Sequence, residues 1–485
     1  MSIQIFLQGN FSGIETFVLG GSAEAGADRA VAGRCIWVSL LAEVLPRALL
    51  AELGLAKILL GTSGGNGFLV VIPQASLPVA EEFLDRAAAD VAAMSGGRLR
   101  LTWGSTENLG DWSIVRKRLA EAVWKPLQIA PGAGLPGNFE PFDRQSDEAE
   151  PKPGAAPASY FDELMAGLRD ASSVGWNPEA PARVVLAEGK QTWTLGPGFD
   201  EIPLARHAAP GADGTGVGSP AELAGKAQGR PAWGVLRGEV DNFDARIRRA
   251  QSIEEHVQLS ALFKQFFAGE LTVACLQPEY WQKVTILQAG GGDFSVFGAW
   301  DALLDLAREI QRLFHRFVET NLQELAGPEG KTITMGIALA GGERETLAEV
   351  FDEAGRRLNS AKAGGRDCFH VFGRAAEWRH INHARDLKEL MLRMIVDLGC
   401  PPEFLAELSG FYREKPDTRA DRPWRYYRRI GRVLGAHKDR EVQRLQKALI
   451  TDIVGKSAAQ VKLRPAGLVA VEWARMLQPR PAGQL

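Results

Sequence analysis

The pattern of apolar and polar positions in the first part of the chain predicts a ferredoxin-like unit. Apolar runs typical of strands lie at residues 3–7, 57–62, 67–73 and 98–104. Segments with helical spacing separate them at 30–53, 78–94 and 111–127, and Pro46 is expected to kink or divide the first. The tetrapeptide SGGN at 63–66 is typical of a hairpin turn. The resulting βαββαβ order predicts a palm-like domain over residues 1–128.

The same order returns in residues 231–374. Strands are predicted at 233–240 and 332–340, helices at 254–268, 301–323 and 345–362, and a hairpin at 283–298. The hairpin sequence TILQAGGGDFSVFG compares directly with ILLGTSGGNGFLVVIP in the first unit. Both sequences place a glycine-rich tip between apolar strands at the same point of the unit. The chain is therefore predicted to contain two related palm-like domains.

The remaining segments differ in composition. Residues 129–230 connect the two units; 129–158 and 205–231 are rich in Gly, Pro and Ala and are predicted as partly disordered linkers. A small strand-bearing segment is expected at 182–204. Residues 375–485 alternate charged and apolar positions at helical spacing, which predicts a helical bundle. The predicted fold class is α+β: two ferredoxin-like palm domains followed by a C-terminal bundle.

Three carboxylates in the second unit lie close to glycines. Glu239 and Asp241 follow the apolar part of the strand at 233–240, and Asp293 follows the tip glycines Gly290, Gly291 and Gly292. If the two strands pair in one sheet, the three carboxylates are expected to converge. Carboxylates hold Mg²⁺, which neutralises a triphosphate, and glycines let phosphates approach the backbone. The pattern indicates nucleotidyl-transfer chemistry, or what remains of it.

Composition limits the other possibilities. The 485 residues carry a formal net charge of −3, which is not the basic balance of a protein that grips nucleic acid alone. The four cysteines lie far apart without a CxxC pair, so neither a disulfide framework nor a zinc site is expected. The first residues lack the features of a signal peptide, and no apolar run reaches the roughly 18 residues of a membrane span. These features predict a soluble cytoplasmic protein that has no membrane partner.

Taken in order, these motifs resemble the large subunit of type III CRISPR–Cas effector complexes, the CRISPR polymerase–cyclase family. The segments similar to the family's first palm are 9–18, 32–43 and 62–73. Those similar to its second, catalytic palm are 234–243, 259–267, 289–298 and 358–373. Residues 466–477 are similar to the end of its terminal helical domain. The resemblance implies two palms and a helical domain over most of the chain.

The departures from the family pattern bear on activity. Active members carry Gly-Gly-Asp-Asp at the hairpin tip, whereas Gly292 stands here in place of the first Asp. Their preceding strand usually ends Asp-x-Asp-Asn, and Glu239 replaces the first of these residues. The family's nuclease His-Asp pair and its interdomain cysteine zinc motif are both missing. The resemblance therefore implies vestigial catalytic residues, with Glu239 and Asp293 as candidate ligands of Mg²⁺ or Mn²⁺ only if the cyclase site is active.

Candidate nucleotide contacts follow from the same resemblance. They are the three tip glycines, Ser260 and Lys362. Lys362 could hold a triphosphate, but a solvated lysine at a helix end, favourable to the helix dipole, explains it equally well. Ser260 could touch a nucleobase, although a serine on a helix surface is the simpler explanation. The tip at 63–66 has no carboxylate and is predicted to be a structural turn.

A basic and aromatic segment at 419–447 is the candidate RNA contact. Arginine planes and aromatic rings suit phosphates and unstacked bases. The alternative is a solvated helix face whose aromatic side chains point into the bundle. The candidate residues are Trp424, Arg425, Arg428, Arg429 and Arg432.

The resemblance leaves three functions open. The favoured hypothesis is a non-enzymatic scaffold in an antiviral RNA-guided complex, which contacts the 5′ end of the guide RNA, the target RNA and neighbouring subunits. The alternative is a cyclic oligoadenylate synthase that is activated by target RNA and uses ATP with a divalent metal. A third hypothesis is a sensor that holds ATP without turnover.

Overall fold

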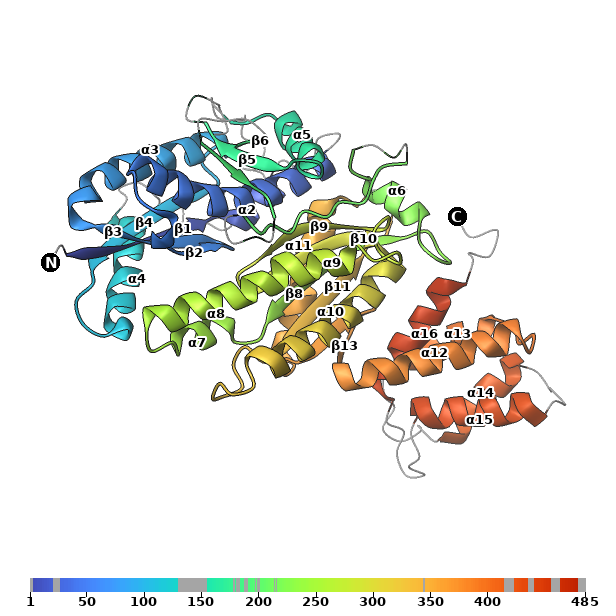
Figure 1. Cartoon of the computed structure of the whole chain (residues 1–485). Helices are drawn as coiled ribbons and strands as arrows, with labels where there is room; N and C mark the ends of the chain where they lie inside the picture. The colour runs from blue at the N-terminus through green and yellow to red at the C-terminus, as the bar shows by residue number, and fades with distance from the viewer. Residues whose placement is uncertain are drawn as a thin grey trace.

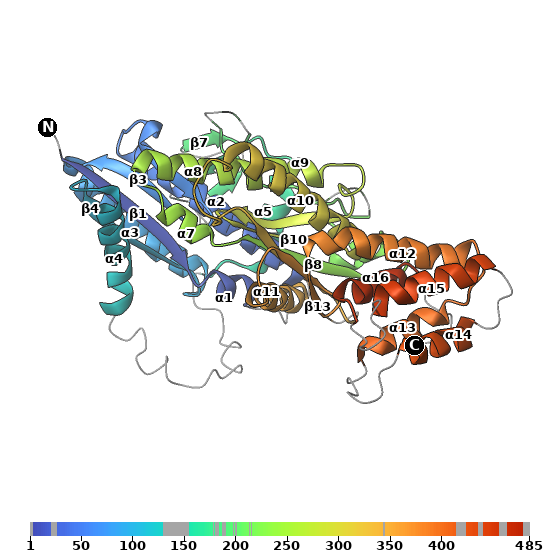
Figure 2. The same ribbon diagram turned by 90° about the horizontal axis from the view of Figure 1, so that it is seen from below.

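The computed structural model describes residues 3–20, 27–129, 155–177, 179, 184–186, 191–196, 198, 201–212, 214, 216–342, 345–413, 423–434, 440–454 and 463–478. They form two larger sheets flanked by helices, a small third sheet and a helical bundle (Figure 1). The first palm and the bundle lie at opposite ends of the molecule, with the second palm between them (Figure 2). The predicted α+β fold class is confirmed.

The first palm is a four-stranded antiparallel sheet with the order β2-β3-β1-β4. Alternate side chains of β1 point to opposite faces of this sheet. Ile5 and Leu7 pack with α2 and α3, whereas Phe6 contacts Trp112 of α4 on the other face. The elements are β1 (Gln4–Ser12), α1 (Ile14–Leu19), α2 (Ala27–Glu52), β2 (Leu60–Gly64), β3 (Gly67–Pro73), α3 (Leu77–Met94), β4 (Arg100–Glu107) and α4 (Trp112–Ile129).

Helix α2 continues through Pro46 as a single element, so of the two predicted effects of this proline the division of the segment does not occur. A proline inside a helix removes one backbone hydrogen bond. The residues around Pro46 are almost fully buried, Leu45 and Ala48 at 0% exposure. Packing on both sides therefore offsets the lost bond.

The second palm repeats the strand order of the first. Its sheet runs β13-β12-β11-β8-β10-β9, so β11-β8-β10-β9 corresponds to β4-β1-β3-β2. The two sheets thus share the topology that was predicted for two palm-like domains. The strands are β8 (Trp233–Val240), β9 (Val284–Gly290), β10 (Asp293–Ala299), β11 (Ile333–Leu339), β12 (Cys368–Val371) and β13 (Arg374–Glu377). The helices are α7 (Phe243–Arg248), α8 (Ile253–Gln265), α9 (Leu271–Cys275), α10 (Trp300–Asn321) and α11 (Leu347–Ala363), with a π-helical turn, Phe266–Glu270, between α8 and α9.

The two palms share one apolar cluster. It contains residues of α2, such as Leu41 and Leu45, together with Leu287 of β9, Phe297 of β10 and Phe351 of α11. All of these side chains are at most 3% exposed. The palms are therefore joined by continuous packing and not only through the connecting chain.

Residues 205–231, which the sequence predicts as a linker, are packed where the structure describes them. The backbone N–H of Ile286 in β9 donates to the carbonyl of His207 at 2.9 Å, and the N–H of Ala209 donates to Thr285 Oγ1 at 3.0 Å. The small side chains of this segment allow the close approach. The neighbouring elements are α5 (Ala158–Leu168), which packs on α2, the sheet of β5 (Ser173–Trp176), β6 (Val184–Leu186) and β7 (Gln191–Thr194), and α6 (Pro220–Gly225).

The C-terminal bundle consists of α12 (Ile381–Val396), α13 (Glu403–Arg413), α14 (Pro423–Leu434), α15 (Arg440–Val454) and α16 (Pro465–Leu477). Its buried residues, such as Phe404 and Trp473, continue the apolar cluster that includes α10 and the outer strands of the second palm. Over the part of the chain that the structure describes, no helix has both the length and the apolar character to cross a bilayer.

Candidate functional site in the cleft between the palms

The tips of the two glycine hairpins touch each other through their backbones. A Cβ atom on Gly290 would lie 2.8 Å from the backbone nitrogen of Gly65, and one on Gly65 would lie 3.3 Å from that of Gly291. Gly65 and Gly291 also have positive φ angles, 62° and 64°, a conformation that favours glycine. Both tips therefore need glycine for close contact and for their turns, independently of any ligand.

Two cavities flank this contact. The smaller, of about 490 Å³, is lined by residues of both palms, among them Glu15, Asn66, Arg237, Glu239, Asp293 and Lys362. The larger, of about 710 Å³, is lined by the first hairpin, α4 and α8, and its charged residues are Arg116, Lys117, Asp244, Arg248 and Lys264. Phe243, Asp244 and Arg248 of α7 line both cavities. Helix α7 is thus their shared wall.

Two of the three predicted carboxylates meet in the smaller cavity. Glu239 of β8 and Asp293 of β10 are directly opposite each other in the antiparallel register. Lys362, in the last turn of α11, places its ammonium group 2.7 Å from Glu239 Oε2. An ion pair in this geometry neutralises Glu239, although both side chains keep solvent contact. Asp293, the other predicted carboxylate in this cavity, has no ion pair among the residues that the structure describes.

The surroundings of Asp293 raise the pKa of its carboxyl above the usual value. Desolvation raises the pKa of this carboxyl to about 6, Glu239 and Glu15 raise it as well, and the Arg237 guanidinium lowers it. Asp293 is nonetheless exposed, so solvent reaches the group and limits the effect of desolvation. Arg237 itself pairs with Glu15 at 3.2 Å and lies 4.3 Å from the centre of the Phe351 ring.

The third predicted carboxylate, Asp241, lies elsewhere. Its oxygens accept hydrogen bonds from the hydroxyls of Thr332 and Thr334, both at 2.7 Å, and from the N–H of Asp367 at 3.0 Å. Strand β8 ends at Val240, so the alternation of side chains does not extend to Asp241. Asp241 is 3% exposed and does not line either cavity. The expected convergence of three carboxylates is therefore limited to Glu239 and Asp293.

Gly292 has no space for a side chain. A Cβ atom built there would lie 2.5 Å from Cγ and 2.9 Å from Cβ of Phe243. Phe243 packs against the fully buried Phe263, with the ring centres 5.0 Å apart. Because the near end of the Phe243 side chain is involved, a change of rotamer alone would not make room.

The other predicted nucleotide contacts are divided between the cavities. The tip glycines and Lys362 line the smaller cavity. Ser260 lines the larger one, and its hydroxyl donates to the carbonyl of His256 one turn earlier on α8, at 2.9 Å. The structure therefore does not bring Ser260 and Lys362 to the same site. Among the residues that the structure describes, no group of three or more His, Cys, Asp or Glu side chains could hold a metal ion.

The predicted RNA contacts on α14 face different environments. Arg425, Arg428 and Arg432 are exposed. Arg429 donates to Glu407 and lies 4.9 Å from the centre of the Phe411 ring. Tyr426 is buried and packs edge-to-face on Phe411, so this aromatic side chain points into the bundle. The side chain of Trp424 lies outside the described residues.

Sequence reasoning missed several residues of the cleft. Arg237 could have been predicted as a residue of the site. It is the one charged residue before Glu239 in an apolar strand, and at two positions from Glu239 it lies on the same face of the sheet. Phe243 and Glu15 carry no comparable signal. A buried ion pair between Glu43 and Lys264, at 2.7 Å, joins the two palms, and its partners are too far apart in the sequence to be paired by pattern.

Comparisons with known proteins agree with this architecture. Residues 232–370 match the family model of the Cas10/Cmr2 second palm domain. Over 190 residues the chain is 25% identical to the CRISPR system single-strand-specific deoxyribonuclease Cas10/Csm1 (subtype III-A) of Thermococcus onnurineus; the match covers 34% of this chain and 23% of that relative. The chain thus matches less than a quarter of the length of the curated relative.

Solved structures with a similar fold cover nearly the whole chain. A Csm1–Csm4 cassette in complex with cA3 aligns with a TM-score of 0.70 and 18% identity, over 98% of this chain and 70% of that one. A Csm1–Csm4 cassette in complex with one ATP aligns with a TM-score of 0.67 and 19% identity, over the same shares. Residues 232–370 therefore match the Cas10/Cmr2 second palm domain, and the fold of nearly the whole chain is similar to that of Csm1.

Proposed function

We propose that this chain is a non-catalytic large subunit of a type III CRISPR effector complex. The single observation that supports this most is the Glu239–Lys362 ion pair, because it neutralises one of the two carboxylates in the cleft. In this proposal the chain contacts the 5′ end of the guide RNA, the target RNA and neighbouring subunits. The solved relatives were crystallised as Csm1–Csm4 cassettes, which supports a partner subunit here.

The residues of the cleft do not fit a pair of catalytic metal ions. Two-metal transfer uses ions about 3.5–4 Å apart, each held by several oxygen ligands. Here Glu239 is bonded to Lys362, Asp241 is bonded to Thr332 and Thr334, and Gly292 offers no oxygen side chain. Asp293 alone cannot organise two ions. The remaining role that the cleft supports is to hold the two palms together, with the cavities available to a nucleotide that is not turned over.

A direct assay tests the proposal. The complex is assembled with guide RNA and incubated with target RNA, Mg²⁺ or Mn²⁺ and labelled ATP, and the products are separated by chromatography. We expect no target-dependent oligoadenylate. Oligoadenylate that appears only with matching target RNA, and disappears in Asp293→Asn, would overturn the proposal and establish the cyclase alternative.

Restoring the missing tip carboxylate should fail for a steric reason. Gly292→Asp is expected to lower the free energy of unfolding by about 1–3 kcal/mol, because its Cβ overlaps Phe243. Gly292→Asp should also produce no oligoadenylate. In the double variant Gly292→Asp/Phe243→Ala, urea denaturation should show a loss of unfolding free energy smaller than the sum of the losses in the two single variants. Strict additivity would contradict the overlap.

The exposed arginines of α14 give a test of the RNA contact. Arg428→Glu/Arg432→Glu is expected to weaken binding of labelled target RNA to the assembled complex by about tenfold and to flatten its salt dependence. Arg86→Glu, a charge reversal on an exposed face of α3 in the first palm, is the control. Equal effects of the α14 variant and the control would exclude a specific contact on α14.

A further inference from the structure

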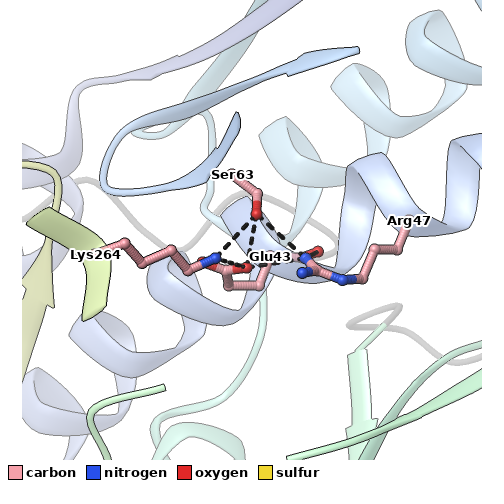
Figure 3. A network of polar contacts seen from close by, with 4 residues as sticks. All are labelled: Glu43, Arg47, Ser63 and Lys264. Carbon is pink, nitrogen blue, oxygen red and sulfur yellow. Dashed lines mark hydrogen bonds and ion pairs between the residues drawn. The ribbon is translucent and has the colours of Figure 1, made fainter. Parts of the chain in front are cut away.

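A cluster of four polar side chains connects the first hairpin to the second palm (Figure 3). Glu43 and Arg47 come from α2, Ser63 from β2 and Lys264 from α8. One oxygen of Glu43, Oε2, accepts from Lys264 Nζ at 2.7 Å, from Arg47 at 2.9 Å and from the Ser63 hydroxyl at 2.9 Å. Lys264 also donates to Ser63 Oγ at 3.1 Å. One buried carboxylate thus gathers groups from both palms.

The burial of this cluster makes its charges interdependent. Glu43 is 2% exposed. Burial by itself raises the pKa of its carboxyl, but Lys264 and Arg47 lower the pKa below its usual value, so the group stays charged. Removing one partner of a buried ion pair leaves an uncompensated charge, which is strongly destabilising. Lys264 therefore depends on Glu43, and the second palm is tied electrostatically to the first.

The position of the cluster links it to the cleft. Ser63 is followed by Gly64 and Gly65 at the tip of the first hairpin. A Cβ on Gly64, whose φ is 104°, would lie 2.6 Å from Glu43 Oε1, so the tip lies directly against the carboxylate. Gly65 then contacts Gly290 and Gly291, next to Asp293. A short chain of contacts runs from Glu43 through the first tip to the second.

We propose that Glu43 and Lys264 are a positioning pair that sets the first hairpin tip against the second, and so fixes the shape of both cavities. The proposal differs from simple stabilisation, because it requires the tip to move when the pair is broken in a protein that remains folded. It does not depend on whether the cleft is catalytic, since it concerns only the distance between the palms.

Spin labels on the two sides of the cleft measure this distance. Asn66→Cys in the first hairpin turn and Ala363→Cys at the end of α11 are both exposed, and the four native cysteines are buried. Pulsed EPR on the doubly labelled 485-residue chain should give one narrow distance distribution. In Glu43→Gln and in Lys264→Met we expect a broader distribution or a second population. Ser63→Ala keeps both charges and provides a milder variant, which should shift the distribution in the same direction.

Two controls separate positioning from loss of stability. Glu309→Gln removes a carboxylate from the Glu309–Arg312 ion pair on α10 and should leave the distribution unchanged. Leu405→Ala creates a cavity in the bundle, where Leu405 is 1% exposed; it should lower stability without changing the distance. In a double-mutant cycle of Glu43→Gln and Lys264→Met, the effects of the two single variants on the folding equilibrium constant should be coupled by a factor of about ten or more. An unchanged distribution in Glu43→Gln, Lys264→Met and Ser63→Ala would overturn the proposal, even if stability fell.

Discussion

Asp241→Ala is expected to lower the free energy of unfolding by about 3–5 kcal/mol, because three donors, one of them fully buried, would lose their acceptor. The hydroxyls of Thr332 and Thr334 and the N–H of Asp367 all donate to this carboxylate. Thr334 is 0% exposed, so water cannot replace the lost bond. Urea denaturation of the 485-residue chain measures the effect.

Glu239→Ala is the matched control for Asp241. Glu239 is a carboxylate two residues away on the same segment, but it is partly exposed and bonded only to Lys362 among the contacts that the structure describes. We expect a change within about 1 kcal/mol. Equal losses in the two variants would mean that Asp241 has no special structural role. A loss of metal binding in Asp241→Ala without a loss of stability would instead assign it to the cleft.

Gly290→Ala is expected to lower the free energy of unfolding by about 1–3 kcal/mol and to separate the two hairpin tips. The added Cβ would meet the backbone nitrogen of Gly65 at 2.8 Å, and a backbone cannot move aside as a flexible side chain can. Chemical denaturation gives the stability. The spin-label pair across the cleft gives the separation.

Gly410→Ala is a control for which we expect a change in stability opposite to that of Gly290→Ala. Gly410 lies within α13, and a Cβ atom there would have no neighbour within 4 Å. Alanine is favoured over glycine inside a helix by about 0.8–1.0 kcal/mol. We therefore expect this variant to be slightly more stable than the parent chain. A loss at Gly410 as large as that at Gly290 would mean that the steric explanation for Gly290 is wrong.

Periodicity alone was sufficient to predict the four strands that the two palms have in common, but not β12 and β13 of the second sheet. The strand predicted at 233–240 coincides with β8, and both glycine hairpins lie at corresponding places in the two sheets. These features are local, since an apolar run and a two-residue turn specify a hairpin wherever it occurs. The pairing of Glu239 with Asp293 followed from the same logic, once β8 and β10 were placed side by side.

The features that the sequence could not predict depend on contacts between distant residues. Asp241 leaves the cleft because the chain turns at Asn242, which has a φ of 55°. The backbone N–H of Asp241 donates to the carbonyl of Thr332, and the carbonyl of Asp241 accepts from the N–H of Gly330. Lys362 and Glu239 are 123 residues apart, and Lys264 and Glu43 are 221 apart. Such ion pairs leave no periodic pattern. The packing of residues 205–209 on β9 could not be predicted either. Their alanine-rich composition alone indicates a linker, and the contact with β9 joins segments that are distant in the sequence.

The apolar cluster that crosses from α2 to β9, β10 and α11 has a consequence for dissecting this protein. A fragment that stops after the first palm would expose Leu41 and Leu45 to water, and a fragment that starts at the second palm would expose Leu287 and Phe351. Neither fragment is expected to be monomeric and soluble when it is expressed alone. The two palms are therefore expected to unfold as one cooperative unit, so that mutations in one should change the unfolding cooperativity of the other.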